Sequence, residues 1–277
     1  MPRPRSAPPP PPDWNSAAAG WARWEPLLMH QLWPVTIPLA RGAAIVEGAR
    51  VLDVGCGTGE PALAFAQLVG PNGRVLAVDV SPAMVKLAAA RARRLAIGNV
   101  RFRHAGIADV RGTFDAVSAR FSLMFVPDVP DALGRLRARL RRGGRAAFAV
   151  WGPLARNVWL KLVAEQTEAA GVPPPDPAAG PHPMRFGRRG SLEALLRAAG
   201  YRDIRTEPVA VEAVIPTAEI YAREVFETSS SLRAATRGLP RATRQRIERR
   251  IARSGARHVT DDAVRLPGLA WVVSGRR

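Results

Sequence analysis

The chain has 277 residues, 47% of them hydrophobic, which suits one α/β domain with additions. No apolar run reaches the roughly 18 residues of a membrane-spanning helix, which excludes a membrane span. The single cysteine, Cys56, excludes an intramolecular disulfide and a cysteine-ligated iron–sulfur cluster, and it indicates a reducing, cytoplasmic setting. Residues 1–13 are rich in proline and lack the apolar segment of a secretory signal, so we expect a disordered tail there.

The net charge of +18 is the value expected of a nucleic-acid-binding protein. However, 39 of the 41 basic residues are arginines, and they are spread along the whole chain. Two concentrations stand out, at 135–145 and 241–253. Solvated helix faces and a surface for RNA or another anion both remain open as interpretations.

The hydrophobic pattern predicts alternating helices and strands. Two helices are expected first, at 14–24 and 26–46, the second broken by Pro34 and Pro38. Further helices are expected at 60–69, 82–97, 129–141, 155–170, 191–199, 217–235 and 240–254. Strands are expected at 50–54, 74–79, 100–103, 114–119, 145–151, 201–215 and 270–275. This alternation predicts an α/β fold with a doubly wound, Rossmann-like sheet of seven strands.

The segment VLDVGCGTG, residues 51–59, is the most informative part of the chain. A short apolar strand is followed by Gly55, Gly57 and Gly59, which permit a tight turn and close approach of a ligand to the main chain. The next helix points its free N–H groups and positive dipole end at whatever lies over this turn. Asp53 stands at the carboxyl edge of the strand, where open α/β sheets bind their ligands.

The glycine spacing separates two kinds of nucleotide site. A dinucleotide fingerprint reads G-x-G-x-x-G, whereas this turn reads G-x-G-x-G, and Glu60 occupies the position of the third glycine. A carboxylate at that point would repel a diphosphate. A phosphate-binding P-loop is also excluded, because no Gly-Lys-Ser/Thr follows.

A second acidic residue, Asp79, ends the next strand, about twenty positions beyond the turn. A carboxylate at this place accepts hydrogen bonds from the two hydroxyl groups of a ribose. Ser81 and Pro82 then begin the following helix as its N-cap and first-turn proline. The combination predicts a nucleoside over Asp79 and a zwitterionic or cationic end near Asp53 and the glycines, which describes S-adenosylmethionine.

Four segments carry a resemblance to a known family. VLDVGCGTGEPALAFA and VLAVDVSPAMVKLAAARA resemble motifs I and II of the class I S-adenosylmethionine-dependent methyltransferases. FDAVSARFSLMFVPDVPDAL and LRRGGRAAFAVWGP resemble the fourth- and fifth-strand segments of the type 11, or ubiquinone/menaquinone-biosynthesis-like, group. The resemblance covers roughly residues 14–277 and implies that the last strand is antiparallel.

The resemblance also implies an organisation into a core and caps. The 14–48 segment would form an N-terminal helical cap, 49–152 the S-adenosylmethionine-binding core, and 153–277 the second half of the sheet with a substrate lid near 171–187 and 216–262. The expected cofactor-binding residues are Asp53, Gly55, Cys56, Gly57, Gly59, Asp79, Val80, Met84, Gly106, Ile107 and Arg120. Trp14, Trp21 and Trp24 are suitably spaced to cover the cofactor, and Arg23 or Arg41 to meet its carboxylate.

The chain departs from the family pattern at one position. Gly106 stands where the family usually has an acidic residue for the adenine amino group, unless Asp109 reaches back. We therefore expect backbone groups and packing by Val80 and Ile107 to hold the adenine.

The expected reaction is methyl transfer to an O, N or C atom of a small, largely apolar or aromatic acceptor. Phe121, Met124, Phe125 and Trp151 are candidates to line the methyl group, although packing of a helix on the sheet explains the first three equally well. His182 is a weak candidate for a general base, and no metal site is expected. The pattern does not favour nucleic acid as a partner, and it leaves the oligomeric state open. Two alternatives remain, which are an RNA methyltransferase and a cofactor-binding protein without methyltransferase activity.

Overall fold

The computed structural model describes residues 13–172 and 180–277, so the expected proline-rich tail lies almost wholly outside the described residues. Its centre is one sheet in the order β3-β2-β1-β4-β5-β8-β6, with β8 antiparallel to both of its neighbours. The strands are β1 Arg50–Val54, β2 Arg74–Asp79, β3 Val100–His104, β4 Phe114–Arg120, β5 Leu140–Trp151, β6 Arg202–Ile215 and β8 Ala263–Arg276. This confirms the doubly wound, seven-stranded sheet with its antiparallel last strand. A two-residue strand, β7 Val259–Thr260, pairs with β8 in addition.

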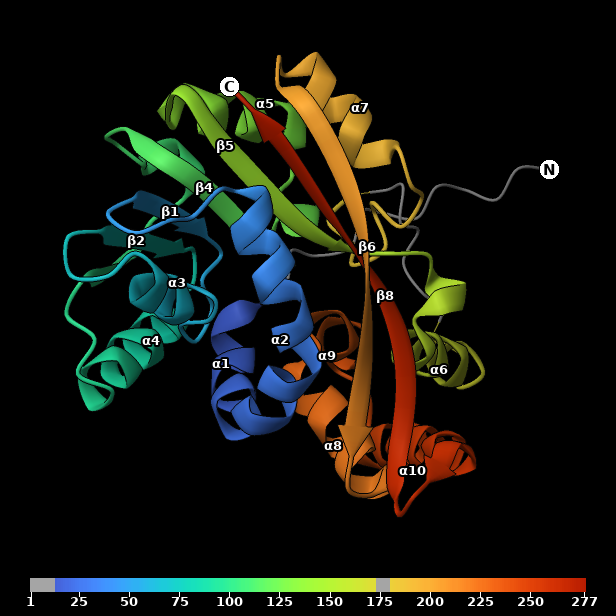
Figure 1. Cartoon of the computed structure of the whole chain (residues 1–277). Coiled ribbons are helices and arrows are strands. Elements are labelled where there is room, and N and C mark those ends of the chain that lie inside the picture. The colour runs from blue at the N-terminus through green and yellow to red at the C-terminus, as the bar shows by residue number, and fades with distance from the viewer. Residues whose placement is uncertain (1–12, 173–179) are drawn as a thin grey trace.

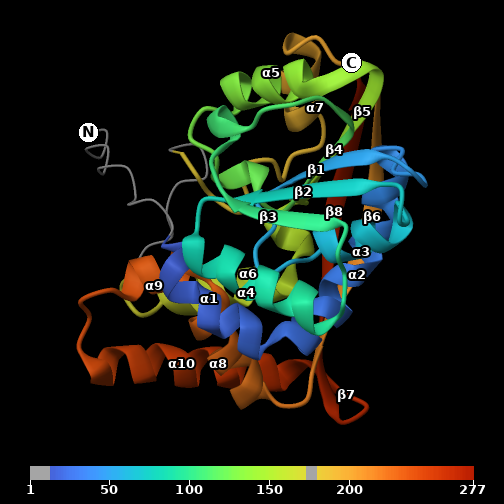
Figure 2. The ribbon, with the colours of Figure 1, turned by 90° about the vertical axis from the view of Figure 1, so that its left-hand side faces the viewer.

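Helices cover both faces of the parallel part of the sheet (Figure 2). On one face lie α5 and α7, and on the other α2, α3 and α4. The helices are α1 Trp14–Arg23, α2 Glu25–Gly42, α3 Ala62–Leu68, α4 Pro82–Arg94, α5 Val129–Arg139, α6 Val158–Glu168, α7 Ser191–Ala198, α8 Ala218–Thr228, α9 Ser230–Thr236 and α10 Arg241–Gly255. Because both faces are covered, β1 and β4 are almost fully buried along their length.

Helix α2 is continuous, so the expected break at Pro34 and Pro38 was wrong. A proline removes one N–H and leaves the carbonyl group four residues earlier without its helical partner. Those carbonyls belong to His30 and Pro34, which are exposed residues on the outer side of the helix. Water can bind them there, while Val35 and Leu39 on the inner side pack in the core and hold the helix in place.

The two long strands β6 and β8 continue well beyond the rest of the sheet (Figure 1). Strand β5 pairs with β8 only from residue 270 onward, whereas β6 pairs with β8 along nearly its whole length. The free half of this ribbon carries a second hydrophobic core against α6, α8, α9 and α10, which includes Tyr221, Val225, Ile247, Ile251 and Leu266. The C-terminal cap is thus a packed unit on a two-stranded ribbon.

Three of the differences from the expected boundaries have a visible structural setting. Strand β8 begins at Ala263 and not near 270, because Pro267 lies where β8 has a neighbour on one side only, and its missing N–H costs no ladder bond there. The expected helix 217–235 is two helices, because Ser229 has an extended backbone and caps α9 by accepting a hydrogen bond from the Leu232 N–H. Strand β5 begins at Leu140, where α5 has just ended.

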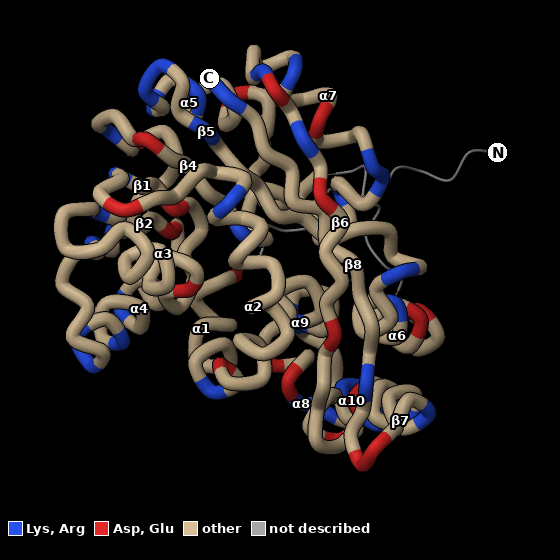
Figure 3. The backbone as a smooth tube through the Cα atoms, in the orientation of Figure 1, with Lys and Arg blue, Asp and Glu red and all other residues tan. Residues whose placement is uncertain are grey.

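Basic residues are distributed over the core and the cap (Figure 3). Several of the 135–145 arginines bond within the chain, such as Arg137 to the Gly200 carbonyl and Arg145 to the Gly42 carbonyl. These bonds favour ordinary surface roles for that segment. Among the described residues, no helix has the length and apolarity to cross a membrane.

Candidate functional site

The glycine turn has the left-handed backbone that its sequence predicts. Gly55, Gly57 and Gly59 have φ values of 71°, 52° and 118°. The N–H groups of Gly55 and Cys56 both donate to the Val78 carbonyl, at 2.8 and 3.1 Å. A Cβ at Gly55 would lie 2.2 Å from the Cβ of Ser122, so the turn also needs glycine to fit against the end of β4.

Asp79 joins the turn to the neighbouring strand. Its Oδ2 accepts a hydrogen bond from the Gly57 N–H at 2.9 Å, and its Oδ1 accepts one from the Ser81 N–H at 2.8 Å. Burial raises the pKa of Asp79, and these N–H groups oppose that rise. Each carboxylate oxygen retains capacity for a second hydrogen bond, as a ribose hydroxyl requires.

Asp53 lies beneath the turn and is fully buried. The Ser118 hydroxyl donates to its Oδ1 at 2.5 Å and so links β1 to β4, while Oδ2 has no hydrogen-bond partner among the described residues. Burial raises the pKa of Asp53 to about 7. The carboxyl therefore joins β1 to β4 and is not in the lining of the adjoining cavity.

A cavity of about 590 Å³ opens over the carboxyl edge of the sheet. Nine of the expected cofactor residues line it, which are Gly55, Cys56, Gly57, Asp79, Val80, Met84, Gly106, Ile107 and Arg120. Asp53 and Gly59 are outside its lining. The volume lies within the range of small-molecule sites. The cofactor roles of all these residues stay predictions.

The lining is acidic although the chain is strongly basic. Five carboxylates face two guanidinium groups in it, with Glu25, Glu60, Asp79, Asp128 and Asp131 against Arg120 and Arg135. A concave site of this sign attracts cations and disfavours a diphosphate. This charge pattern was not anticipated from the sequence, because its members come from five separate segments.

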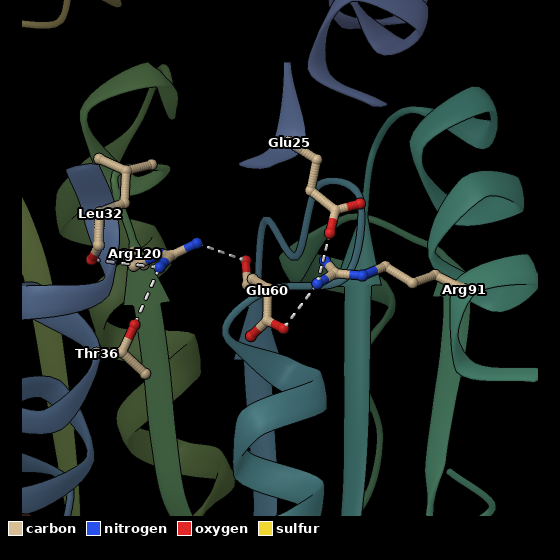
Figure 4. Close-up of polar contacts among 6 residues, drawn as sticks. All are labelled: Glu25, Leu32, Thr36, Glu60, Arg91 and Arg120. Carbon is tan, nitrogen blue, oxygen red and sulfur yellow. Dashed lines mark hydrogen bonds and ion pairs between the residues drawn. The ribbon is translucent and has the colours of Figure 1, made fainter. Parts of the chain in front are cut away.

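Arg120 is the buried cation of this cavity. Its Nη1 donates to the Thr36 hydroxyl at 3.0 Å, and its Nη2 donates to the Glu60 carbonyl at 3.1 Å (Figure 4). Burial lowers the pKa of Arg120 to about 10, so it remains charged at neutral pH. The residue fastens α2 to the segment that follows the glycine turn.

Glu60 and Glu25 share a second arginine. Nη2 of Arg91 lies 2.8 Å from Glu25 Oε1 and 3.2 Å from Glu60 Oε1 (Figure 4). Burial raises the pKa of Glu60, against the opposing charges of Arg91 and Arg120. In the sequence, Glu60 served only to exclude a dinucleotide, and its role in the cavity lining was missed.

The other end of the cavity is formed by backbone and apolar groups. Val80, Gly106 and Ile107 all line it. Asp109 does reach back, and its Oδ2 accepts a hydrogen bond from the Gly106 N–H at 3.1 Å, but Asp109 is not part of the lining. The expectation that packing and main-chain groups hold an adenine here stays a prediction.

Helix α1 covers the cavity with aromatic side chains. Trp14 and Trp21 line it, and Trp14 packs edge-on against Phe125 at 4.9 Å between ring centroids. Trp24 instead donates its Nε1–H to Glu227 of α8. Arg23 and Arg41 are not in the lining, because they form ion pairs with Glu227 and Glu207 respectively.

The ends of β4 and β5 bring two aromatic rings together. Phe121 has a left-handed φ of 54°, rare for a bulky residue, and stacks on Trp151 at 3.8 Å. Phe121 and Phe125 line the cavity, whereas Met124 and Trp151 are buried behind it. His182 is also outside the lining, and its Nδ1 accepts a hydrogen bond from the Met184 N–H. A base role for His182 stays a prediction.

Comparison with known proteins agrees with this geometry. Residues 51–144 match the family described as "Methyltransferase domain". The chain is 34% identical over 186 residues to nocamycin O-methyltransferase of Saccharothrix syringae, and the match covers 62% of this chain and 66% of the relative. It is 37% identical over 124 residues to 2-phytyl-1,4-naphtoquinone methyltransferase of Synechococcus elongatus, covering 43% and 52%.

The chain belongs to the class I S-adenosylmethionine-dependent methyltransferases. Within this family it falls in the broad ubiquinone/menaquinone-biosynthesis-like group. The matched segments span between about half and two thirds of these two curated relatives. The fold also matches the structure of Haemonchus contortus phosphoethanolamine N-methyltransferase 2 with phosphomonomethylethanolamine and S-adenosylhomocysteine, at a TM-score of 0.59 and 15% identity, over 96% of this chain and 60% of that one. Both curated relatives are named for small-molecule substrates, which does not support the RNA alternative.

Proposed function

We propose that the protein transfers the methyl group of S-adenosylmethionine to an O, N or C atom of a small, largely apolar or aromatic acceptor. The observation that carries this proposal is the acidic cavity over the glycine turn, with Asp79 in the same lining as the turn itself. S-adenosylmethionine has a net positive charge, which suits an excess of carboxylates. Its ribose hydroxyls suit the two oxygens of Asp79, and its compact amino-acid end suits a turn without side chains.

The cofactor would supply an already activated methyl group. The chain would then bind and align the two reactants and exclude water. In well-oriented reactions such effects lower the activation barrier by roughly 7–11 kcal/mol. Apolar residues of α1 and α2 suit the acceptor part of the cavity, among them Trp21, Leu28, Met29 and Leu32. Phe121, which is held on Trp151, would complete an aromatic wall.

The reaction proposed here does not depend on a histidine base. The chain has four histidines, two lysines and two tyrosines, and none of them is in the cavity lining. Both tyrosine hydroxyls donate to main-chain carbonyls elsewhere, Tyr201 to Leu133 and Tyr221 to Trp159. We therefore favour an acceptor atom that is nucleophilic by itself or ionises without such a base.

The domain roles belong to the same proposal. Residues 14–48 would form the N-terminal cap, 49–152 the cofactor core, and 153–277 the rest of the sheet with the substrate lid. Part of the 171–187 lid segment lies outside the described residues. We place the reaction in the cytoplasm, because the one cysteine, Cys56, is free and buried.

Calorimetry with S-adenosylmethionine and S-adenosylhomocysteine tests the cofactor, and we expect micromolar binding of both. Transfer of a radiolabelled methyl group to a panel of quinols, phenols and aliphatic acids, with transfer RNA as a further arm, tests the acceptor class. We expect label in at least one small acceptor and none in RNA. Absence of cofactor binding, or labelled RNA alone, would contradict the proposal.

A further inference from the structure

The lining of the cavity has two separate polar centres. The main-chain N–H groups of Ser81 and Gly57 donate hydrogen bonds to the carboxylate of Asp79. Glu60 instead faces Arg91, Arg120 and Glu25. The two carboxylates therefore have different hydrogen-bond and ion-pair partners, so they can serve different groups of one ligand.

The second centre contains an under-satisfied ion group. One nitrogen of Arg91, Nη2, contacts both Glu25 and Glu60, while Nε and Nη1 of Arg91 are buried and have no hydrogen-bond partner in the described part of the chain. One guanidinium therefore serves two carboxylates. A buried group of this kind is costly unless a ligand or water completes its hydrogen bonds.

The atom of this centre that lacks a hydrogen-bond donor among the described residues is Oε2 of Glu60. The side chain of Glu60 is nine-tenths buried, and its Oε2 accepts no hydrogen bond from any residue that the structure describes. Figure 4 shows this second oxygen turned away from Arg91. The last torsion of a glutamate is broad, so the carboxylate can turn that oxygen toward a donor in the cavity without moving the main chain. Glu25, also in the lining, enters its ion pair through Oε1 alone.

A positive group stands beside these acids. Arg120 directs its guanidinium at the Glu60 carbonyl and not at the Glu60 carboxylate (Figure 4). The centre thus presents carboxylates and a guanidinium next to each other, which is complementary to a zwitterion with an ammonium and a carboxylate. A phosphate or a neutral ligand would leave Glu60 without its donor.

We propose that Glu60 and Glu25 form the receptor for the α-ammonium group of the bound cofactor, beside Arg120, which faces its α-carboxylate. Arg91 is a positioning residue that holds the two glutamates together from behind. This inference rests on the proposed function, since the ligand is the amino-acid end of S-adenosylmethionine. It assigns the recognition of that end to a residue directly after the glycine turn and to the first turn of α2.

The test measures how much the α-ammonium group of the ligand adds to the affinity, with and without the carboxylates of Glu60 and Glu25. Calorimetry at pH 7.5 compares S-adenosylhomocysteine with 4-(5′-adenosylthio)butanoate, in which hydrogen replaces the ammonium group. The proteins are the wild type, Glu60→Gln, Glu25→Gln and the control Glu207→Gln, which removes an exposed ion pair outside the cavity. We expect the wild type and the control to bind S-adenosylhomocysteine at least about tenfold more tightly than the deaminated compound.

The glutamine variants should reduce the ratio of the two affinities to about threefold or less. They should weaken the binding of S-adenosylhomocysteine and leave the binding of the anionic deaminated compound unchanged or make it tighter. If Glu60→Gln does not fold, Glu25→Gln decides by the same ratio. The inference is overturned if the wild type binds both compounds equally, or if both variants weaken the two compounds in parallel. Failure of the wild type to bind S-adenosylhomocysteine or S-adenosylmethionine would instead overturn the proposed function.

Discussion

The backbone N–H of Gly57 donates a 2.9 Å hydrogen bond to Oδ2 of Asp79, a residue 22 positions further along the chain. This contact joins the glycine turn after β1 to the end of β2, so one carboxylate both shapes the turn and faces the cavity. Replacing Asp79 therefore tests the ribose site directly.

We expect Asp79→Asn to weaken binding of S-adenosylhomocysteine by about 1–3 kcal/mol. The amide retains one acceptor oxygen but directs an NH₂ group at a main-chain N–H or at a ribose hydroxyl. Calorimetry measures the loss. Asp203→Asn is the control, because Asp203 pairs with Arg276 at the opposite edge of the sheet and should bind like the wild type. Equal affinity in both variants would remove the ribose assignment.

Two glycines of the turn should respond differently to alanine. At Gly57 a Cβ meets nothing within 4 Å, so Gly57→Ala should cost about 1–2 kcal/mol for the left-handed backbone alone. At Gly55 the Cβ would also overlap Ser122, so Gly55→Ala should lose about 3 kcal/mol or more of the free energy of unfolding. Denaturant titration compares the two variants, and equal losses would contradict the close approach of Ser122 to Gly55.

Glu224 should make stability fall with rising pH. This buried carboxyl lies on α8 beside the Thr228 hydroxyl at 2.9 Å, and burial raises its pKa to about 7 from an ordinary 4.5. The folded state therefore binds a proton that the unfolded state releases above pH 4.5, and this stabilisation is lost as pH rises through 7.

We compare the free energy of unfolding of Glu224→Gln with that of the wild type at each pH. Between pH 5 and pH 8 we expect this difference to shift by up to roughly 3 kcal/mol in favour of the variant. Asp53, with a pKa of about 7, contributes the same trend to both proteins and cancels in the comparison. Parallel curves for the variant and the wild type would show that Glu224 is ionised in the folded protein.

Glu227 holds α1 over the cavity. Its carboxylate accepts hydrogen bonds from Arg23 and Trp24, and the Trp21 Nε1–H donates to the neighbouring Thr228 carbonyl at 3.0 Å. Glu227→Gln should weaken this attachment by about 1 kcal/mol and speed hydrogen exchange in residues 14–24 severalfold. Glu207→Gln provides the matched control on another exposed ion pair. Unchanged protection of α1 would mean that packing alone holds the helix.

The glycine turn and Asp79 could be located from the sequence because their chemistry is local. Strand, turn and helix follow one another directly, and the carboxyl ends of parallel strands meet at one edge of the sheet. The same reasoning predicted that Arg120, Gly106 and Ile107 lie at this edge, and all three line the cavity. It could not tell that Asp53 lies below the turn and outside the lining, since that depends on the hydroxyl of Ser118 from β4.

The continuity of α2 was likewise beyond local pattern. Pro34 and Pro38 argue against a helix by propensity, and only the burial of its opposite face against the sheet overrides that preference. The acidic centre of Glu25 and Glu60 needed the same information, because the arginine that joins them comes from α4.

The sequence by itself determined the succession of strands and helices along the chain, the glycine turn and the acidic residue Asp79, because backbone freedom and hydrophobic period act between near neighbours. Only the tertiary structure decided which charges share a cavity. Arg23 and Arg41 pair on the surface, while Arg120 and Arg91 are brought to buried positions beside Glu60. That outcome depends on how α2 and α4 pack around the turn, since a charge acts on whatever lies within a few ångströms in space, whatever its distance along the chain.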